Sequence, residues 1–276
     1  MMEKLSSNPK VSVIMSVYNA EKTLRVAIDS ILKQTYTNWE FIICNDSSTD
    51  GTQSILDEYK RLYPDKFILL KNSKNMFLSF SLNRCLEKCT GELVARMDGD
   101  DISSPDRFEK QVNFLKNNLQ YQVVGTLMQR FDDDGLHDVV CMKEKPDKNI
   151  LRKQVPFCHA TIMMYKEAYD AVGGYKVSDM TRRSQDYDMW FRFYKCAYKG
   201  YNIQEPLYLV REDINAIKRR TWNNRYNIMK IQFKGYKLLN FPKIWYIYPI
   251  MEFSKAFIPS KVVLMYRKCK WFKKNS

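Results

Sequence analysis

A regular alternation of short apolar runs with helix-patterned segments is the feature that most restricts the fold of this chain. The apolar runs lie at 11–17, 41–44, 67–70 and 93–97, and between them apolar residues recur at three- and four-residue spacing. Runs that are almost continuously apolar are typical of strands buried on both faces, with helices as crossovers of a parallel sheet. The sequence therefore predicts an α/β fold with a mostly parallel sheet and flanking helices, and 276 residues are enough to bury its core.

Polar side chains follow three of these strands. Tyr18 and Asn19 come after the first strand, Asp46 after the second, and the cluster Asp98-Gly99-Asp100-Asp101 after the fourth. Ligands of such sheets bind outside the carboxyl ends of the strands, where the loops converge. We therefore expect these segments, distant in sequence, to surround one crevice.

The acidic cluster is the strongest candidate for a metal site. Asp98 and Asp100 are one residue apart after a strand, so in an extended backbone their carboxylates point to the same side. Hard oxygen ligands of this kind suit Mg²⁺ or Mn²⁺, which can also bind a diphosphate, and Asp101 is a further candidate. The alternative is a strand-end loop in which Asp101 or Ser103 caps the next helix, and the motif alone does not separate the two readings.

Several segments, taken in order, resemble family 2 glycosyltransferases. They lie at 13–19 (VIMSVYN), 30–35 (SILKQT), 45–52 (NDSSTDGT), 95–107 (ARMDGDDISSPDR), 159–161 (HAT) and 185–192 (QDYDMWFR). The resemblance covers residues 10 to 213. It implies a GT-A fold and inverting transfer of a sugar from a nucleotide sugar, expected to be a UDP-sugar, to an acceptor hydroxyl. The implied setting is cell-surface polysaccharide synthesis.

The resemblance also implies roles in donor binding, carried over by motif position. Tyr18, with Asn19 beside it, would lie next to the nucleobase, and Asp46 would accept a hydrogen bond from that base. Asp98 would bind the ribose or the metal shell, and Asp100 would be the direct ligand of Mn²⁺ or Mg²⁺. Without the neighbouring matches, the favoured interpretation of Tyr18 would be an aromatic lid, and that of Asp46 a turn-forming residue.

For catalysis, the resemblance implies that Asp186 is the general base. One-step inversion requires a carboxylate that takes the proton of the attacking hydroxyl. The usual Glu-Asp pair of the family is here Gln185-Asp186, and Asp188 lies two residues further on, so Asp188 is the competing assignment. His159 is a candidate near the donor or acceptor or a core histidine, and Arg182 is a candidate phosphate ligand or a solvated charge.

The formal net charge of +14 is concentrated at one end of the sequence. Residues 214–276 contain fifteen Lys or Arg and a single acid, whereas residues 1–213 contain 30 of each sign. We therefore expect a catalytic domain over 1–213 and a basic, amphipathic helical segment over 214–276. Basic and aromatic residues at 222–237 and 265–274 are typical of helices on anionic membranes. A basic helical hairpin packed on the catalytic domain is the alternative.

The location and the rival functions follow from these observations. The N-terminus has no apolar signal core, and no window approaches the roughly 18–20 apolar residues of a membrane span. We expect a cytoplasmic protein, peripheral on the inner face of the membrane, with a lipid-linked saccharide as acceptor.

The rival functions are a nucleic-acid-binding protein that uses the basic tail and a catalytically inactive family member that binds sugar nucleotides. Because the first leaves the acidic cluster unexplained, no nucleic-acid partner is expected.

Overall fold

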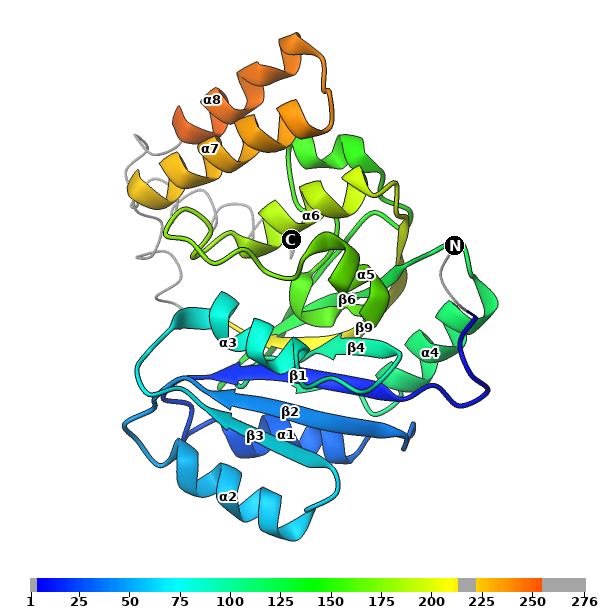
Figure 1. Cartoon of the computed structure of the whole chain (residues 1–276), viewed down its shortest axis with the longest axis vertical. Helices are drawn as coiled ribbons and strands as arrows, with labels where there is room; N and C mark the ends of the chain where they lie inside the picture. Colours follow the sequence, from blue (N-terminus) through cyan, green and yellow to red (C-terminus); the bar gives the residue numbers. More distant parts are fainter. Residues whose placement is uncertain (1–3, 213–221, 255–276) are drawn as a thin grey trace.

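The computed structural model describes residues 4–212 and 222–254 of the chain. Helices cover both faces of one sheet, and a pair of C-terminal helices is stacked on the outside (Figure 1). The strands are β1 (Val11–Val17), β2 (Trp39–Asn45), β3 (Phe67–Lys71), β4 (Leu93–Arg96), β5 (Ile102–Ser103), β6 (Val123–Asp132), β7 (Gly135–Val140), β8 (Met163–Tyr165) and β9 (Gly200–Arg211). The helices are α1 (Leu24–Leu32), α2 (Thr52–Leu62), α3 (Phe77–Leu86), α4 (Arg107–Asn117), α5 (Lys166–Val172), α6 (Gln185–Lys195), α7 (Trp222–Leu238) and α8 (Ile247–Ser254), with short 3₁₀ turns η1 (Lys148–Arg152), η2 (His159–Thr161) and η4 (Lys243–Tyr246).

The first half of the sheet is the parallel arrangement that the sequence predicts. The strand order is β3-β2-β1-β4-β8-β6-β9-β5, and the pairs β3–β2, β2–β1 and β1–β4 are all parallel. All seven residues of β2 are buried, as are all but one of β1. Burial on both faces explains why these strands read as continuous apolar runs.

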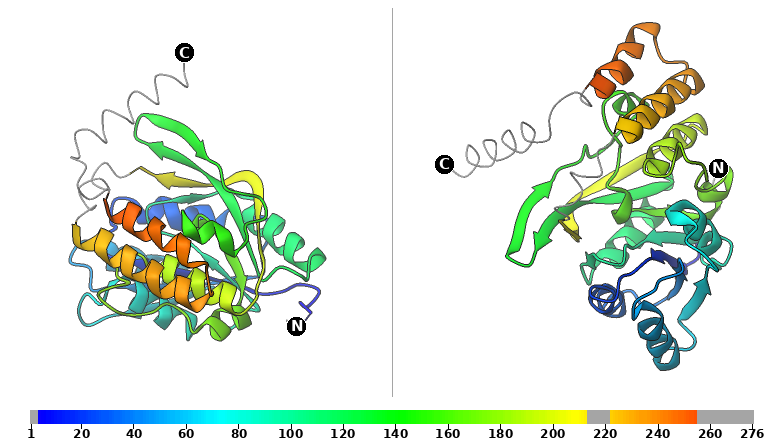
Figure 2. Two further views of the ribbon diagram at one scale, coloured as in Figure 1. Left: turned by 90° about the horizontal axis from the view of Figure 1, so that it is seen from above. Right: turned by 90° about the vertical axis from the view of Figure 1, so that its left-hand side faces the viewer.

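The second half of the sheet is mixed, which the strand–helix alternation did not predict. The short strand β8 is antiparallel to both β4 and β6, and β6 then pairs parallel with β9. The turn at Asp132–Gly135 closes the antiparallel pair β6–β7, which projects from the body of the molecule (Figure 2). The α/β class is therefore confirmed, and the sheet is parallel mainly over its first four strands.

The C-terminal extension contains the predicted helix, and that helix packs on the catalytic part. Gly235 of α7 lies so close to the Phe191 ring of α6 that a Cβ would come within 2.3 Å of it. The Gln232 amide donates to the Tyr187 hydroxyl at 2.9 Å, and the buried Tyr236 donates to the Arg152 carbonyl at 3.0 Å. Apolar contact and buried hydrogen bonds therefore attach α7 to α6 and η1, as in the packed-hairpin alternative.

Two of the expectations for the tail concern residues that the structure does not cover. Residues 214–221 and the basic aromatic stretch 265–274 lie outside the described ranges. Within 4–212 and 222–254, no helix has the length and apolar character that crossing a bilayer requires.

Candidate functional site

The first three strand ends are level with one another, so their loops share one edge of the sheet. Val17 at the end of β1 is in register with Asn45 at the end of β2, and the Asp46 N–H donates to the Val17 carbonyl at 2.8 Å. The Asn72 N–H donates to the Asn45 carbonyl at 2.9 Å, which extends the same pairing to the residue after β3. The parallel sheet thus brings together the segments that the sequence placed around one crevice.

Asn19 braces this edge, and Tyr18 beside it is exposed. Asn19 has φ +51°, a left-handed conformation that Asn tolerates better than most residues. Its N–H donates to Ser48 Oγ at 3.0 Å, and its side-chain oxygen accepts from the Thr49 N–H at 2.9 Å. The β1 and β2 loops are therefore held together by Asn19, while half of the Tyr18 surface faces solvent and can meet a ligand.

Asp46 is buried and oriented by two donors. Its Oδ1 accepts from Asn72 Nδ2 at 2.6 Å and from the Met76 N–H at 2.8 Å. The side chain of Asn72 is fixed in turn, because Arg84 Nη1 donates to Asn72 Oδ1 at 2.6 Å. Sequence reasoning missed Asn72 and Met76, although Asn72 lies two residues after the third apolar run and the strand-end rule applied to that run points to it.

The acidic cluster packs against the end of β1. A Cβ on Gly99 would lie 2.8 Å from Val17 Cγ1, so only glycine allows this close approach. The Thr23 hydroxyl donates to the Gly99 carbonyl at 2.8 Å, which ties the cluster to the loop before α1. Asp98 and Asp100 are therefore presented on a backbone fixed at both sides.

The carboxylates of the cluster have different surroundings. Asp98 pairs with the buried Arg96, and its N–H donates to the Tyr208 hydroxyl at 3.0 Å. Asp101 is buried and accepts from the Arg211 N–H at 2.9 Å. Burial, and then the charges of Asp98 and Asp100, raise the pKa of Asp101 well above its usual range. Asp100 is the exposed member of the cluster. Asp101 therefore supports the loop from its buried side, whereas Asp100 lies on the loop surface.

These residues fit a metal that is shared with a diphosphate better than a metal centre built from protein alone. Over the described part of the chain, no group of three or more His, Cys, Asp or Glu side chains could hold a metal ion. Mg²⁺ is commonly bound through one or two carboxylates together with substrate phosphates. Asp98 and Asp100 supply the hard oxygen atoms for that mode, and the crowding of three carboxylates favours a cation there.

Asp186 lies in the first turn of α6. Burial raises the pKa of its carboxyl, whereas the N–H groups of Tyr187 and of Asp186 itself, and the charge of Arg96, act in the opposite direction. Helix N-termini stabilise carboxylates in this way. A partly exposed carboxylate with a raised pKa and a nearby cation has the properties required of a general base.

Asp188, the competing assignment, is engaged in a structural ion pair. Its Oδ2 accepts from Arg192 Nε at 2.9 Å. The same guanidinium donates to the carbonyl oxygens of Val172 and Gly174, the second at 2.9 Å. Asp188 therefore orients an arginine that ties α6 to the end of α5, a role that leaves Asp186 as the better candidate for proton transfer.

Arg96 connects the acidic cluster with α6, a role that sequence reasoning did not assign to it. It is buried and pairs with Asp98, while its Nε and Nη1 have no hydrogen-bond partner in the described ranges. Its charge also acts on Asp186 and on His159. Its signal in the sequence is a charged side chain within an otherwise apolar run, two residues before Asp98.

His159 and Arg182, the two remaining candidates, both contact aromatic rings. His159 Nε2 is 2.8 Å from the Tyr175 hydroxyl, and burial, together with Arg96, lowers the pKa of His159 well below its usual range. A neutral histidine packed edge-on to Trp190 is the core histidine that the sequence left open. Arg182 lies with its Cζ 3.2 Å from the ring centroid of Phe77, at the beginning of α3.

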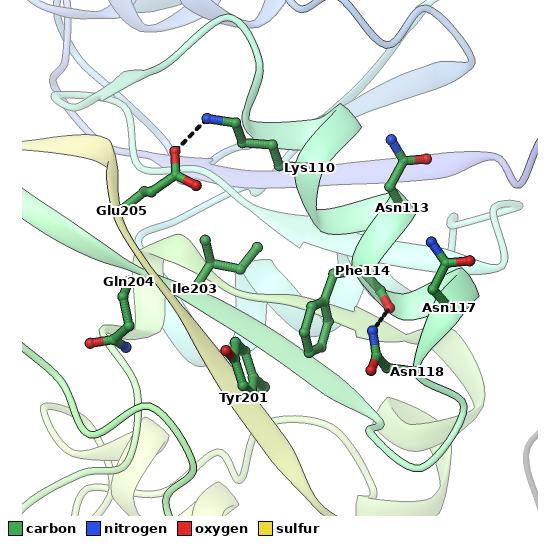
Figure 3. A pocket seen from close by; sticks show the side chains of 9 residues that line it. All are labelled: Lys110, Asn113, Phe114, Asn117, Asn118, Tyr201, Ile203, Gln204 and Glu205. Carbon is green, nitrogen blue, oxygen red and sulfur yellow. Dashed lines mark hydrogen bonds and ion pairs between the residues drawn. The ribbon is translucent and has the colours of Figure 1, made fainter.

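A hollow of about 560 Å³ lies elsewhere, between α4 and the first half of β9 (Figure 3). Phe114 and Tyr201 stack at its floor with ring centroids 4.4 Å apart, and the Lys110–Glu205 ion pair closes one side. None of the candidate site residues lines it. The hollow is therefore separate from the strand-end edge, where the candidate residues gather.

Comparisons with known proteins identify similar chains. Residues 12–173 match the family model described as Glycosyl transferase family 2. The putative glycosyltransferase EpsE of Bacillus subtilis (strain 168) is 45% identical over 264 residues, 96% of this chain and 95% of the relative. The UDP-Gal:alpha-D-GlcNAc-diphosphoundecaprenol beta-1,3-galactosyltransferase of Escherichia coli is 31% identical over 223 residues, 77% of this chain and 78% of the relative.

The fold of this chain is similar to that of a solved structure. The mannosyltransferase PcManGT from Pyrobaculum calidifontis, in complex with GDP-Man and Mn²⁺, superposes with a TM-score of 0.62 and 18% identity, covering 96% of this chain and 81% of that one.

Proposed function

This chain belongs to glycosyl transferase family 2 and is a glycosyltransferase, and we propose that it inverts the transferred sugar with Asp186 as its general base. The observation that carries the proposal is the placement of Arg96, whose charge acts on Asp98 of the donor edge and on Asp186 of α6. Direct displacement needs a base close to the bound donor, and an arginine whose charge acts on both carboxylates supports placing Asp186 near the Asp98 loop.

The donor in this proposal is a nucleotide sugar bound along the strand ends. The exposed Tyr18 ring offers a face for the nucleobase, and the fixed Asp46 carboxylate offers it an acceptor. Asp98, which pairs with Arg96, is assigned to the ribose or the metal shell, and the exposed Asp100 to the metal at the diphosphate. A UDP-sugar is our first choice, because the Escherichia coli relative is named for UDP-Gal, whereas PcManGT was solved with GDP-Man.

The metal in this proposal is Mn²⁺ or Mg²⁺, held by Asp100 with Asp98 beside it. When bound, the ion neutralises charge on the departing diphosphate. The crowded carboxylates of Asp98, Asp100 and Asp101 support this assignment, since they repel one another without a cation. PcManGT, solved with Mn²⁺, shares the fold.

The chemical step is a single displacement at the anomeric carbon. An acceptor hydroxyl attacks that carbon from the face opposite the diphosphate while Asp186 takes its proton. The new bond from the hydroxyl oxygen to carbon forms as the carbon–oxygen bond to the diphosphate breaks, and the nucleoside diphosphate leaves with the electron pair. Its raised pKa makes Asp186 a stronger proton acceptor than an ordinary aspartate.

We further propose that the acceptor is a lipid-linked saccharide and that the C-terminal extension brings the enzyme to an anionic membrane on the inner side of the cell. Exposed apolar side chains gather on η4 and α8, at Ile244, Ile247, Ile250 and Met251. Residues 214–276 also carry the excess of positive charge. Apolar and basic groups together are what peripheral membrane helices use, and the Escherichia coli relative is named for a diphosphoundecaprenol-linked acceptor.

Nucleotide binding tests this function most simply. We expect UDP or GDP to raise the unfolding temperature of the full chain only when Mn²⁺ is present, because the ion joins the diphosphate to Asp100. Asp100→Asn should abolish the metal-dependent part, and Asp134→Asn, which changes an exposed acid on the β6–β7 turn, is the matched control. No stabilisation by either nucleotide with Mn²⁺ would refute the proposed donor site.

A further inference from the structure

Phe77 occupies an unfavourable backbone conformation at the edge of the proposed donor site. Its φ is +66°, in the left-handed region that bulky residues rarely adopt, and 44% of its surface is exposed. The preceding residue, Met76, donates its N–H to Asp46. Neither backbone preference nor burial accounts for a phenylalanine here, and strained residues of this kind concentrate at functional sites.

The ring of Phe77 is covered by a cation from the segment that leads into α6. Arg182 Cζ lies 3.2 Å from the ring centroid, and in Figure 1 residues 173–184 arch over the beginning of α3. A guanidinium over an aromatic face is attracted by the negative potential of the ring. The pair therefore joins the donor edge to the segment that precedes Asp186.

A second contact of α3 holds the other end of the same segment. Asn83 Nδ2 donates to the Tyr175 carbonyl at 2.7 Å, and the Tyr175 N–H donates to Asn83 Oδ1 at 2.9 Å. Both ends of residues 173–184 are thus attached to α3, by paired hydrogen bonds at Tyr175 and by the cation–π contact at Arg182.

Hydrogen bonds within this segment connect it to the first turn of α6. The buried Thr181 donates from its hydroxyl to the Lys176 carbonyl at 2.6 Å, and the Ser184 N–H donates to the Thr181 carbonyl at 3.0 Å. The Asp188 N–H then donates to the Ser184 carbonyl at 3.2 Å, in the first turn of α6. Movement of Arg182 therefore displaces the start of the helix that bears Asp186.

We propose that Phe77 and Arg182 form a clasp that positions Asp186 relative to the donor. The inference rests on the proposed function, because positioning has a kinetic meaning only if Asp186 is the base. In this proposal the ring of Phe77 provides the face on which Arg182 packs, which gives the strained residue a purpose. Both are positioning residues that act through α6, and Arg182 is assigned to the ring in preference to a donor phosphate.

Limited proteolysis tests the clasp without any need for activity. Trypsin cuts after Arg182 and Arg183, and mass spectrometry can follow these two sites separately from all others. We expect Phe77→Gly, which suits the left-handed backbone but removes the ring, to speed cleavage there about fivefold, the factor that one cation–π contact supplies. Phe77→Tyr keeps the ring and should keep the wild-type rate. Equal rates in all three proteins, or faster cleavage at every site with a lower unfolding temperature, would overturn the clasp.

The kinetics of donor turnover then test whether the clasp positions Asp186. Phe77→Gly and Arg182→Ala should each lower kcat about fivefold with little change in KM, and the double variant should be no slower than either single variant. Lys176→Ala removes a cation from the same segment and serves as the control. Weaker binding of UDP with Mn²⁺ by Arg182→Ala, but not by Phe77→Gly, would overturn the proposal and make Arg182 a phosphate ligand. If the wild type turns over no donor, the proposed function fails, and proteolysis still decides whether the clasp exists.

Discussion

The donor edge and the α6 region hold their candidate residues in different ways. At the donor edge, Asp46 and Asp98 directly follow parallel strands, and neighbouring main-chain groups fix their loops. Asp186 instead lies on a helix whose position depends on long side-chain bridges, such as Arg192 to Gly174 and Arg182 to Phe77. The sheet therefore pre-forms one side of the site, whereas side-chain contacts set the other, and substitutions on the two sides should have different consequences.

The largest contrast is expected between two acids on the same turn of α6. Asp186→Asn should lower donor turnover by roughly a hundredfold to ten-thousandfold, the usual contribution of a general base. Asp188→Asn should lower it less than tenfold, because Asp188 only orients Arg192. Steady-state turnover of both purified variants with the same nucleotide sugar checks this, and equal losses would remove the distinction between the two acids.

A smaller effect is expected from crowding the donor edge. Gly99→Ala places a methyl group 2.8 Å from Val17 Cγ1, so the acidic loop must shift. We expect affinity for UDP with Mn²⁺ to fall by about tenfold and stability by about 1–3 kcal/mol, the usual cost of overpacking. Calorimetric titration and chemical unfolding measure the two quantities.

A compensating substitution sharpens that result. Val17→Ala removes the atom that the new methyl group meets, so Gly99→Ala with Val17→Ala should recover much of the lost affinity. A double variant as weak as Gly99→Ala alone would show that the crowding argument is wrong.

The two acids of α6 should also differ in stability, and in opposite directions. The pKa of Asp186 is raised by burial, so its charged form destabilises the fold, and the penalty grows as pH rises from the unfolded to the folded pKa. Asp186→Asn should therefore be as stable as the wild type or more stable at neutral pH. Asp188→Asn should lose about 1–2 kcal/mol, because it removes a charged hydrogen-bond partner of Arg192. Denaturant unfolding of both variants at neutral pH measures the difference.

The smallest predicted effect concerns the pH profile. A base works only when deprotonated, so turnover should fall as pH is lowered through the pKa of Asp186, with an inflection above the usual aspartate range. The profile of kcat/KM between about pH 4 and 8 checks this. Asp188→Asn should keep the inflection, and a flat wild-type profile over that range would argue against Asp186 as the base.

Sequence patterns predicted the donor edge better than the α6 region, for a physical reason. Nearly continuous apolar runs predict the positions of parallel strands, and the carboxyl ends of those strands predict where the candidate site lies. Asp46 and Asp98 could therefore be placed near each other from the sequence. The three-residue β8 pairs with β4 and β6 far along the chain, and no local pattern reveals such pairing.

The contacts that sequence reasoning missed are of the same non-local kind. Arg96 lies in one of the segments that resemble the family, but its charge acts on Asp186 only because folding brings α6 near it. The periodicity of residues 222–238 predicted a helix, and the close contact of Gly235 with Phe191 decided what that helix packs on. Patterns along the chain predict elements and strand ends, whereas packing between elements decides which side chains meet.

Real-time proton NMR of donor hydrolysis tests the central claim most directly. Water can replace the acceptor hydroxyl, so the anomer released first reports the stereochemistry of the displacement before it equilibrates. From an α-linked nucleotide sugar, with Asp186 acting as general base in one step, the β-anomer should appear first, and Asp186→Asn should release almost none. Release of the α-anomer first would contradict a single displacement at this site.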